Sequence, residues 1–305
     1  MKHLINLFDV TVEEIERIFN LSAKLKKELK EGTPHHLLKG KTLGMIFSKS
    51  STRTRVSFEV GMYQLGGYPL FLSSSDIQLG RGETIYDTAQ VLSRYISGIM
   101  IRTFKHSDVE DLAHHGTIPV INGLTDLMHP CQILADLFTV HEAKGKLKGL
   151  KMAYVGDGNN VANSLLHGCA KIGMNICVAT PEGYGCDEGI IEEAKADAKK
   201  SGCRLLLTED PVEAVSGADV IYTDTWVSMG QEAEKEIRVK TFMPYQVNNK
   251  LFGHAKSDAM FLHCLPAYRG LEVSAEIIDG PNSAVFEEAE NRLHVQKAIM
   301  AILMQ

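Results

Sequence analysis

The 305-residue sequence lacks the patterns that mark several common classes of protein. It has no G-x-x-x-x-G-K-[ST] motif, which argues against a P-loop nucleotide site. No apolar run reaches about 18 residues and the N-terminus has no signal-peptide core, so we expect a cytoplasmic protein without membrane spans. No repeat period and no low-complexity tract is visible, which argues against a solenoid or a long disordered linker.

Metal-binding and disulfide patterns are absent as well. The six cysteines are scattered without a C-x-x-C pair, and the twelve histidines include no H-E-x-x-H motif. We therefore expect free thiols in a reducing compartment, no metal and no cofactor. The net charge is only −6, which leaves no basic footprint for nucleic acid or an anionic membrane. Any anionic ligand must be held by local arginines.

What the chain does contain is an alternation of extended and helical segments. Its length favours two domains, and the pattern that begins at 38–47 (LKGKTLGMIF) restarts at 147–158 (LKGLKMAYVGDG). Such alternation predicts an α/β fold of two doubly wound domains, each a mostly parallel sheet flanked by helices. We expect the first domain at 1–145 and the second at 146–287, with a final helix, 288–305, that packs back on the first.

The first helix has a clear start signal. Thr11 and Glu14 have the spacing of a capping box, in which each side chain accepts the other residue's backbone N–H. Apolar residues then recur at helical spacing and predict a buried stripe: Ile15, Ile18, Leu21, Leu25 and Leu29.

The stretch FSKSSTRTRVSFEVG, residues 47–61, concentrates hydroxyls and arginines where a second helix begins. An arginine in a first helical turn is unfavourable, because the N-terminus already carries partial positive charge and unpaired N–H groups. An anion would remove that conflict, and free amides, hydroxyls and a guanidinium together suit a phosphate. The alternative is ordinary Ser or Thr capping with solvated arginines.

Other polar residues fall at the carboxyl ends of expected strands, where ligands gather in doubly wound sheets. Arg102 ends one strand, the turn GDGNN at 156–160 follows another, and Asp224 and Cys264 end two more. We expect the residues of the two domains to face each other across a cleft.

Four motifs occur in order along the chain: S-T-R-T-R at 51–55, H-P-C-Q at 129–132, D-x-x-x-S-M-G at 224–230 and H-C-L-P at 263–266. With them the chain resembles the aspartate/ornithine carbamoyltransferase family over essentially its full length. The resemblance implies transfer of the carbamoyl group from carbamoyl phosphate to the δ-amine of ornithine, giving citrulline and phosphate.

The resemblance also implies roles for single residues. The catalytic ones would be Arg102, His129, Asp224 and Cys264. The carbamoyl phosphate site would comprise Ser51, Thr52, Arg53, Thr54, Gln78, Arg102, His129, Gln132, Cys264, Leu265 and Arg292. In this family the loop corresponding to 73–83 reaches into the adjacent subunit, so Gln78 is expected to act in trans within a homotrimer, and a solvated turn is the alternative.

The resemblance assigns ornithine to a second set of residues: Asn160, Asn163, Asp224, Ser228 and Met229. A polar residue in a first helical turn, such as Asn163, is also commonly a capping group. Cys264 would lie beside the reacting amine, although a buried cysteine is usually only a small apolar filler. Either Cys264 or the departing phosphate could accept the proton of the amine.

Several alternatives remain open at the level of sequence. Acetylated ornithine and putrescine are other possible amines, although putrescine has no need of Asp224 and the S-M-G residues. The GDGNN turn could instead bind a dinucleotide, with Glu182 on the ribose, but the third glycine of G-x-G-x-x-G is missing. A catalytically silent member of the family is a third possibility. The sequence does not show whether the reaction serves synthesis or breakdown of citrulline.

Overall fold

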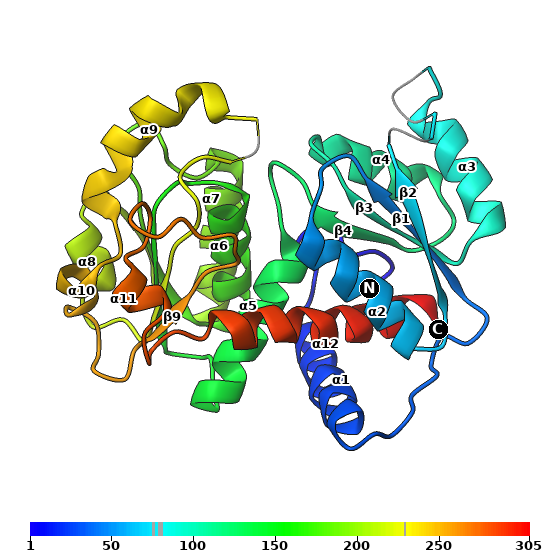
Figure 1. The fold of residues 1–305 in the computed structure, drawn as a ribbon, viewed down its shortest axis with the longest axis horizontal. Coiled ribbons are helices and arrows are strands. Elements are labelled where there is room, and N and C mark those ends of the chain that lie inside the picture. Colours follow the sequence, from blue (N-terminus) through cyan, green and yellow to red (C-terminus); the bar gives the residue numbers. More distant parts are fainter. Residues whose placement is uncertain (75–76, 79–81, 229) are drawn as a thin grey trace. The chain divides into compact units, whose positions relative to one another are not determined.

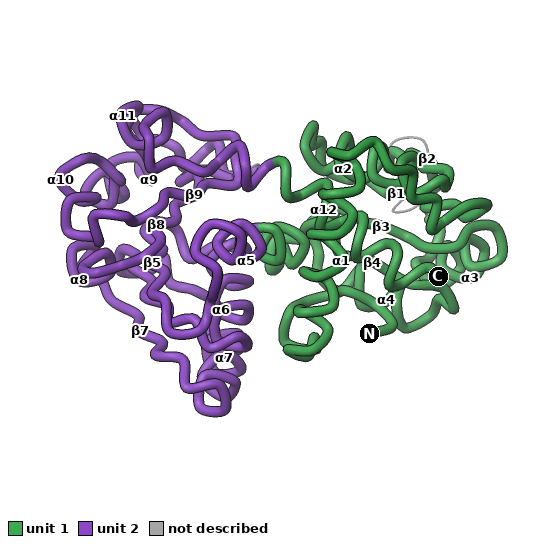
Figure 2. Tube along the Cα trace, turned by 90° about the horizontal axis from the view of Figure 1, so that it is seen from below, with its two compact units in different colours: residues 1–135, 290–305 green, residues 136–289 purple. Residues whose placement is uncertain are grey.

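The computed structural model describes residues 1–74, 77–78, 82–228 and 230–305, which form two compact units (Figure 2). Unit 1 comprises Met1–Ala135 and Glu290–Gln305, and unit 2 comprises Asp136–Ala289. Each unit is a parallel sheet flanked by helices, which confirms the expected fold class (Figure 1). The domain limits expected at 145 and 287 stay predictions.

Unit 1 contains a four-stranded parallel sheet in the order β2-β1-β3-β4. Its strands are β1 Thr42–Phe47, β2 Tyr68–Ser73, β3 Gly98–Arg102 and β4 Val120–Leu124. Its helices are α1 Val12–Lys30, α2 Thr52–Gln64, α3 Ile85–Tyr95 and α4 His106–His115, together with the first part of α5 Pro130–Lys144 and the last part of α12 Val285–Met304. Phe47 pairs with both Ser73 and Arg102, so three strands end at one edge of the sheet.

The start of α1 confirms the capping box, because the Thr11 hydroxyl accepts the Glu14 N–H at 3.2 Å and the Glu14 carboxylate accepts the Thr11 N–H at 3.0 Å. The expected apolar stripe is only partly right. Ile15, Ile18 and Leu25 are buried, whereas Leu29 is 37% exposed. Leu29 lies in the last turn of α1, where the helix runs out to an exposed loop.

One face of the unit 1 sheet packs against α3 and α4. Alternate residues of β3, Ile99 and Ile101, and Ile46 of β1 are fully buried there. The helices contribute Val109 and Leu112 from α4. This packing holds the carboxyl ends of β1 and β3 in place: α2 follows the end of β1, and Arg102 is the last residue of β3.

Unit 2 contains a five-stranded parallel sheet in the order β7-β6-β5-β8-β9. Its strands are β5 Lys151–Val155, β6 Asn175–Ala179, β7 Leu205–Thr208, β8 Val220–Tyr222 and β9 Met260–Leu262. Its helices are α6 Asn160–Ile172, α7 Glu188–Ser201, α8 Pro211–Val215, α9 Lys235–Phe242, α10 Asn249–Phe252 and α11 Ala275–Ile278, with short 3-10 turns η1 Glu232–Glu234 and η2 Met243–Tyr245.

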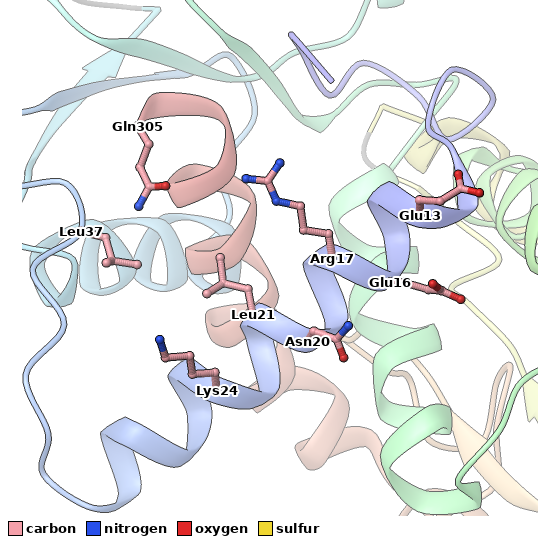
Figure 3. A pocket seen from close by; sticks show the side chains of 8 residues that line it. All are labelled: Glu13, Glu16, Arg17, Asn20, Leu21, Lys24, Leu37 and Gln305. Atoms are coloured by element: carbon pink, nitrogen blue, oxygen red, sulfur yellow. The ribbon is translucent and has the colours of Figure 1, made fainter.

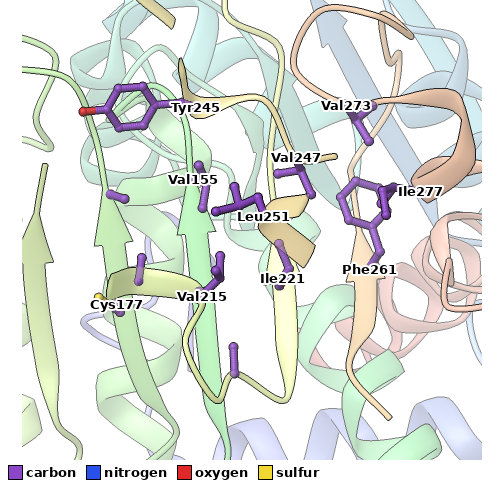
Figure 4. Packing of buried hydrophobic residues seen from close by; sticks show 14 of the residues in the cluster. Val155, Cys177, Val215, Ile221, Tyr245, Val247, Leu251, Phe261, Val273 and Ile277 are labelled. Carbon is purple, nitrogen blue, oxygen red and sulfur yellow. The ribbon is translucent and has the colours of Figure 1, made fainter. Parts of the chain in front are cut away.

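The core of unit 2 is a dense apolar layer on one face of this sheet, shown in Figure 4. Val155, Ile221 and Phe261 point from β5, β8 and β9 toward Val215 of α8 and Leu251 of α10. All three strands therefore end at a common edge, and the polar residues that follow them are brought together there. None of the helices in the described ranges is long and apolar enough to cross a membrane.

Candidate active site

The expected phosphate-binding stretch forms the start of α2. Ser51 is the N-cap: its backbone is extended and its hydroxyl accepts the Thr54 N–H at 3.2 Å. Thr52 begins the helix, and Arg53 lies in its first turn, which contains no acidic residue. Thr54 is buried. The helix start therefore offers backbone N–H groups, hydroxyls and a cation to one small region, as an anion requires.

Three arginines surround His129, which is 4% exposed and immediately precedes α5. Burial lowers the pKa of His129 well below its usual value, and the charges of Arg292, Arg102 and Arg53 lower it further. The imidazole is therefore neutral at physiological pH and can donate one N–H. Like charges gathered around a buried neutral ring are unfavourable unless an anion binds among them. The structure thus brings together four residues expected from distant parts of the sequence.

Arg292 connects this cluster to both flanking helices. One of its terminal nitrogens donates to the Gln132 side chain in the first turn of α5, and the other donates to the Thr54 hydroxyl at 3.2 Å. Gln132 and Arg292 are both almost fully buried. The guanidinium therefore fixes the starts of α2 and α5 relative to each other within unit 1.

Gln78 is not joined to this cluster, and Met229 cannot be placed. Gln78 lies on the loop after β2 with an exposed side chain, and the hydrogen bonds of the described part of the chain do not connect it to the arginines. Met229 lies outside the described residues.

In unit 2, Asp224 is the centre of a second cluster. It is 7% exposed and follows β8. The Cys264 thiol donates to its Oδ1 at 3.2 Å, and the Asn159 amide donates to its Oδ2 at 2.8 Å. Burial raises the pKa of the Cys264 thiol well above its usual value, and the Asp224 carboxylate raises it further. Cys264 therefore holds its proton, directed at Asp224.

Asn159 was not singled out from the sequence, whereas its neighbour Asn160 was. Asn159 is the N-cap of α6, and its amide oxygen accepts the N–H groups of Val161 and Ala162 at 2.9 and 3.2 Å. Its amide nitrogen is thereby directed at Asp224. The N-cap position itself, after a strand and a GDG turn, was the signal that could have identified it.

The other expected ornithine residues lie nearby with mixed roles. Asn160 begins α6. Asn163 is buried, and its amide oxygen accepts the backbone N–H of Asp187, the N-cap of α7, at 3.1 Å. Asn159, not Asn163, caps α6, and the assignment of Asn163 to ornithine stays a prediction. The Ser228 N–H donates to Gln231 at 3.0 Å, which shapes the turn around it.

The H-C-L-P segment is held by a buried dyad that sequence reasoning missed. The Leu265 N–H donates to His263 Nδ1 at 2.9 Å, so His263 carries its hydrogen on Nε2 and donates it to Glu272 at 3.2 Å. Both side chains are fully buried. Leu265 has a φ of 57°, a left-handed conformation that its contact with His263 supports. Glu272 lies nine residues beyond His263 in an irregular loop, and no local pattern reveals the pair.

Glu288 supports the same segment from α12. It accepts the His263 backbone N–H at 2.9 Å and the Tyr222 hydroxyl at 3.2 Å. Burial raises the pKa of Glu288 well above its usual value, and the nearby Asp136 carboxyl raises it further. The cluster around Cys264 is therefore backed by a buried carboxyl whose charged form is disfavoured by burial and by Asp136.

Asp224, His263 and Cys264 carry the atoms that a metal would need, within 4.8 Å of one another. In this structure those atoms serve each other or the backbone: Cys264 donates to Asp224, Leu265 donates to His263 Nδ1, and His263 Nε2 donates to Glu272. A metal here would have to displace each of these hydrogen bonds.

The GDGNN turn bears on the dinucleotide alternative. A Cβ on Gly158 would lie 2.2 to 2.5 Å from the backbone of Gly185 and Cys186, and the Gly158 N–H donates to the Tyr184 carbonyl at 2.8 Å. The space beside this glycine, which a pyrophosphate would approach, is filled by the chain itself. The glycine serves internal packing.

A surface hollow on unit 1 lies elsewhere (Figure 3). It is lined by Glu13, Glu16, Arg17, Asn20, Leu21, Lys24, Leu37 and Gln305. None of these is among the expected site residues, and the lining combines two carboxylates with one guanidinium and one amine. We assign it no role in the chemistry.

Comparison with known proteins matches both halves of the chain to family models. Residues 2–142 match the model described as "Aspartate/ornithine carbamoyltransferase, carbamoyl-P binding domain", and residues 148–303 match "Aspartate/ornithine carbamoyltransferase, Asp/Orn binding domain". The first match contains Arg53, Arg102 and His129, and the second contains Asp224, Cys264 and Arg292.

Individual relatives are similar over nearly their whole length. The ornithine carbamoyltransferase of Carboxydothermus hydrogenoformans is 61% identical over 99% of this chain and 97% of its own, and that of Bacillus subtilis is 59% identical over 99% and 94%. Among solved structures, the ornithine carbamoyltransferase from Pyrococcus furiosus is 58% identical with a TM-score of 0.97, covering 99% of this chain and 97% of its own.

Proposed function

The chain belongs to the aspartate/ornithine carbamoyltransferase family, and we infer that it transfers the carbamoyl group of carbamoyl phosphate to the δ-amine of ornithine, giving citrulline and phosphate. The observation that carries this inference is the gathering of Arg53, Arg102 and Arg292 around a neutral, buried His129. That arrangement suits a substrate that brings a dianion and a carbonyl oxygen to one place.

In the carbamoyl phosphate half, the start of α2 receives the phosphate. The N–H groups and hydroxyls of Ser51, Thr52 and Thr54, with Arg53 and Arg102, neutralise its charge. His129 and Gln132 direct donors at the carbamoyl oxygen, and Arg292, which donates to Gln132, adds a third positive charge for the phosphate. Donors fixed in this way stabilise the negative charge that gathers on that oxygen in the tetrahedral intermediate.

In the ornithine half, Asp224 orients the amine and Cys264 lies beside it. The amine has a pKa near 10.4 when free, so only about one molecule in 10³ to 10⁴ is neutral and nucleophilic at pH 7, a cost of about 4 to 5 kcal/mol. Once neutral, its nitrogen bonds to the carbonyl carbon and the carbon–oxygen bond to phosphate breaks. Because Cys264 already holds its own proton, the departing phosphate is the better acceptor for the proton of the amine.

We also propose that the protein is a homotrimer, that it is cytoplasmic and that it acts in arginine metabolism. A homotrimer would bring Gln78 of one subunit to the site of its neighbour, and several large apolar side chains on unit 1 are exposed as an interface would require: Val56, Val60, Tyr63, Tyr68 and Tyr95. Six free cysteines suit the cytoplasm, and citrulline as the proposed product suits a role in arginine metabolism.

The test is formation of a ureido product from carbamoyl phosphate with ornithine, putrescine, acetylornithine and aspartate, each offered separately at equal concentration. We expect ornithine to give the dominant rate, because Asp224 and the 224–230 segment suit an amine that also carries an α-amino acid group. A dominant rate with another amine would show that the ornithine assignment is wrong and would leave the carbamoyl phosphate assignment unchanged. No product with any amine would indicate a silent member of the family.

A further inference from the structure

Gln296 is a fully buried glutamine on α12, one turn beyond Arg292, and sequence patterns give it no role. With its amide oriented to satisfy its neighbours, its oxygen lies 2.9 Å from both Nε and Nη2 of Arg292. Its nitrogen lies 2.5 Å from the Ser57 hydroxyl. One side chain therefore contacts the guanidinium of Arg292 and a hydroxyl on α2.

The contact on α2 leads to the phosphate-binding turn. Ser57 is buried and donates its hydroxyl hydrogen to the Arg53 carbonyl oxygen at 2.6 Å. The amide of Gln296 is thus connected through Ser57 to the backbone of Arg53 and directly to the guanidinium of Arg292. Two of the three arginines around His129 are linked by this single amide.

The packing of α12 on α2 fixes where Gln296 can lie (Figure 1). A Cβ on Gly61 would lie 3.1 Å from both Lys297 and Met300, so the helices approach closely at that point. The Lys297 amine donates to Gln64 at 2.9 Å, which sets the register farther along. With the helices held this close, Gln296 has little freedom to move away from Arg292.

The amide of Gln296 differs from a carboxylate, the other side-chain group that commonly binds a guanidinium. A carboxylate would accept the same N–H groups, but it would cancel one unit of the positive charge that the phosphate needs. A neutral amide holds the guanidinium in place and leaves its charge intact. A buried amide is costly unless its hydrogen bonds are made, and both ends of Gln296 have partners here.

We propose that Gln296 is a positioning residue that holds Arg292 for carbamoyl phosphate through its amide oxygen and links it to the phosphate-binding turn of α2 through Ser57. This inference rests on the proposed function. It concerns binding of the anion and predicts no effect on binding of the amine.

The experiment compares Gln296→Leu, Gln296→Glu and the matched control Gln64→Leu, which removes another polar contact between α2 and α12 without touching Arg292. For Gln296→Leu we expect the KM for carbamoyl phosphate to rise about tenfold, the effect of losing hydrogen bonds to a charged group, with the KM for ornithine within about twofold of wild type. Gln296→Glu should raise the carbamoyl phosphate KM at least as much, because it retains the contact and cancels the charge. Gln64→Leu should change only thermal stability.

Binding of inorganic phosphate, measured by calorimetry, needs no turnover. It therefore tests the positioning role of Gln296 separately from the proposed carbamoyltransferase function. A weaker phosphate affinity in both Gln296 variants and not in Gln64→Leu supports the positioning role even if the amine has been misassigned. If the wild type makes citrulline while the Gln296 variants retain its carbamoyl phosphate KM and phosphate affinity, the proposed function stands and the positioning role is wrong. A fall in melting temperature alone, equal in all three variants, would also contradict it.

Discussion

At the scale of single residues, the protonated state of the Cys264 thiol limits what this residue can do. Its thiol donates to Asp224, and burial and that carboxylate together keep it from ionising. We propose that its contribution to turnover is to orient the amine with Asp224 and that it is not the general base. The distinction can be tested by substitution, because replacing a general base removes the proton acceptor, whereas replacing an orienting group only displaces the amine.

We expect Cys264→Ser to leave carbamoyl phosphate binding close to that of wild type while lowering kcat with ornithine by about tenfold or more, because a small displacement of the amine costs rate steeply. Calorimetric binding and steady-state kinetics measure the two effects. The matched control is Cys203→Ser, a buried thiol of the same unit that donates to the Met174 carbonyl at 3.0 Å. If Cys264→Ser weakened carbamoyl phosphate binding as much as turnover, the proposal that Cys264 acts only on the amine would be contradicted.

The site residues that lie in sequence motifs could be predicted, whereas the buried residues that form hydrogen bonds to them could not. The cap at Ser51 and the arginine of the first turn follow from local pattern, because a helix start has a recognisable sequence. Glu272 contacts His263 from an irregular loop, and Gln296 contacts Ser57 on another helix, so no local pattern reveals either pair. Asn159 differs from these two: its place after a strand and a GDG turn predicts a helix cap, but the sequence does not show which of two adjacent asparagines is the cap.

At the scale of elements, the turn between β5 and α6 shows how a glycine can mislead. Gly158 resembles part of a dinucleotide fingerprint, yet the backbone of 185–186 occupies the space beside it. The same residue type at the same place after a strand can therefore serve close packing within the chain. Only the path of a segment almost 30 residues away distinguishes the two uses.

For Gly158→Ala we expect the free energy of unfolding to fall by about 2 kcal/mol or more, because the added methyl group meets fixed backbone. Chemical denaturation monitored by circular dichroism measures the change. Gly185→Ala is the matched control, since a Cβ there meets nothing within 4 Å, and it should stay within about 0.5 kcal/mol of wild type. Two equally stable variants would show that the turn is not packed in this way.

At the scale of the whole molecule, the sequence indicates two α/β domains but does not reveal where the units divide. The chain passes from unit 1 to unit 2 inside α5 and returns inside α12. No Gly, Pro or Ser linker marks either passage, and a continuous helix gives no signal at the residue where its neighbours change. The alternating pattern reports strands and helices, which explains why the fold class was predictable.

The proposed trimer makes a prediction that only a mixture of chains can test. Arg53→Ala and Gln78→Ala should each be inactive alone. Refolded together in equal amounts, they should regain about a quarter of wild-type activity, because half of the subunits keep Arg53 and half of their neighbours keep Gln78. Affinity capture through a tag on one variant checks that mixed trimers form, and mixed trimers without activity would place both residues in one chain's site.

The burial that keeps Cys264 protonated extends to the other thiols. Burial raises the pKa of Cys131 and Cys186 to about 12, raises that of Cys177 and Cys203 to about 11, and raises that of Cys169 well above its usual value. Oxidants and alkylating reagents attack the thiolate. A protein whose thiols rarely ionise should withstand air, peroxide and iodoacetamide without added reductant, and should lose that tolerance as soon as it unfolds.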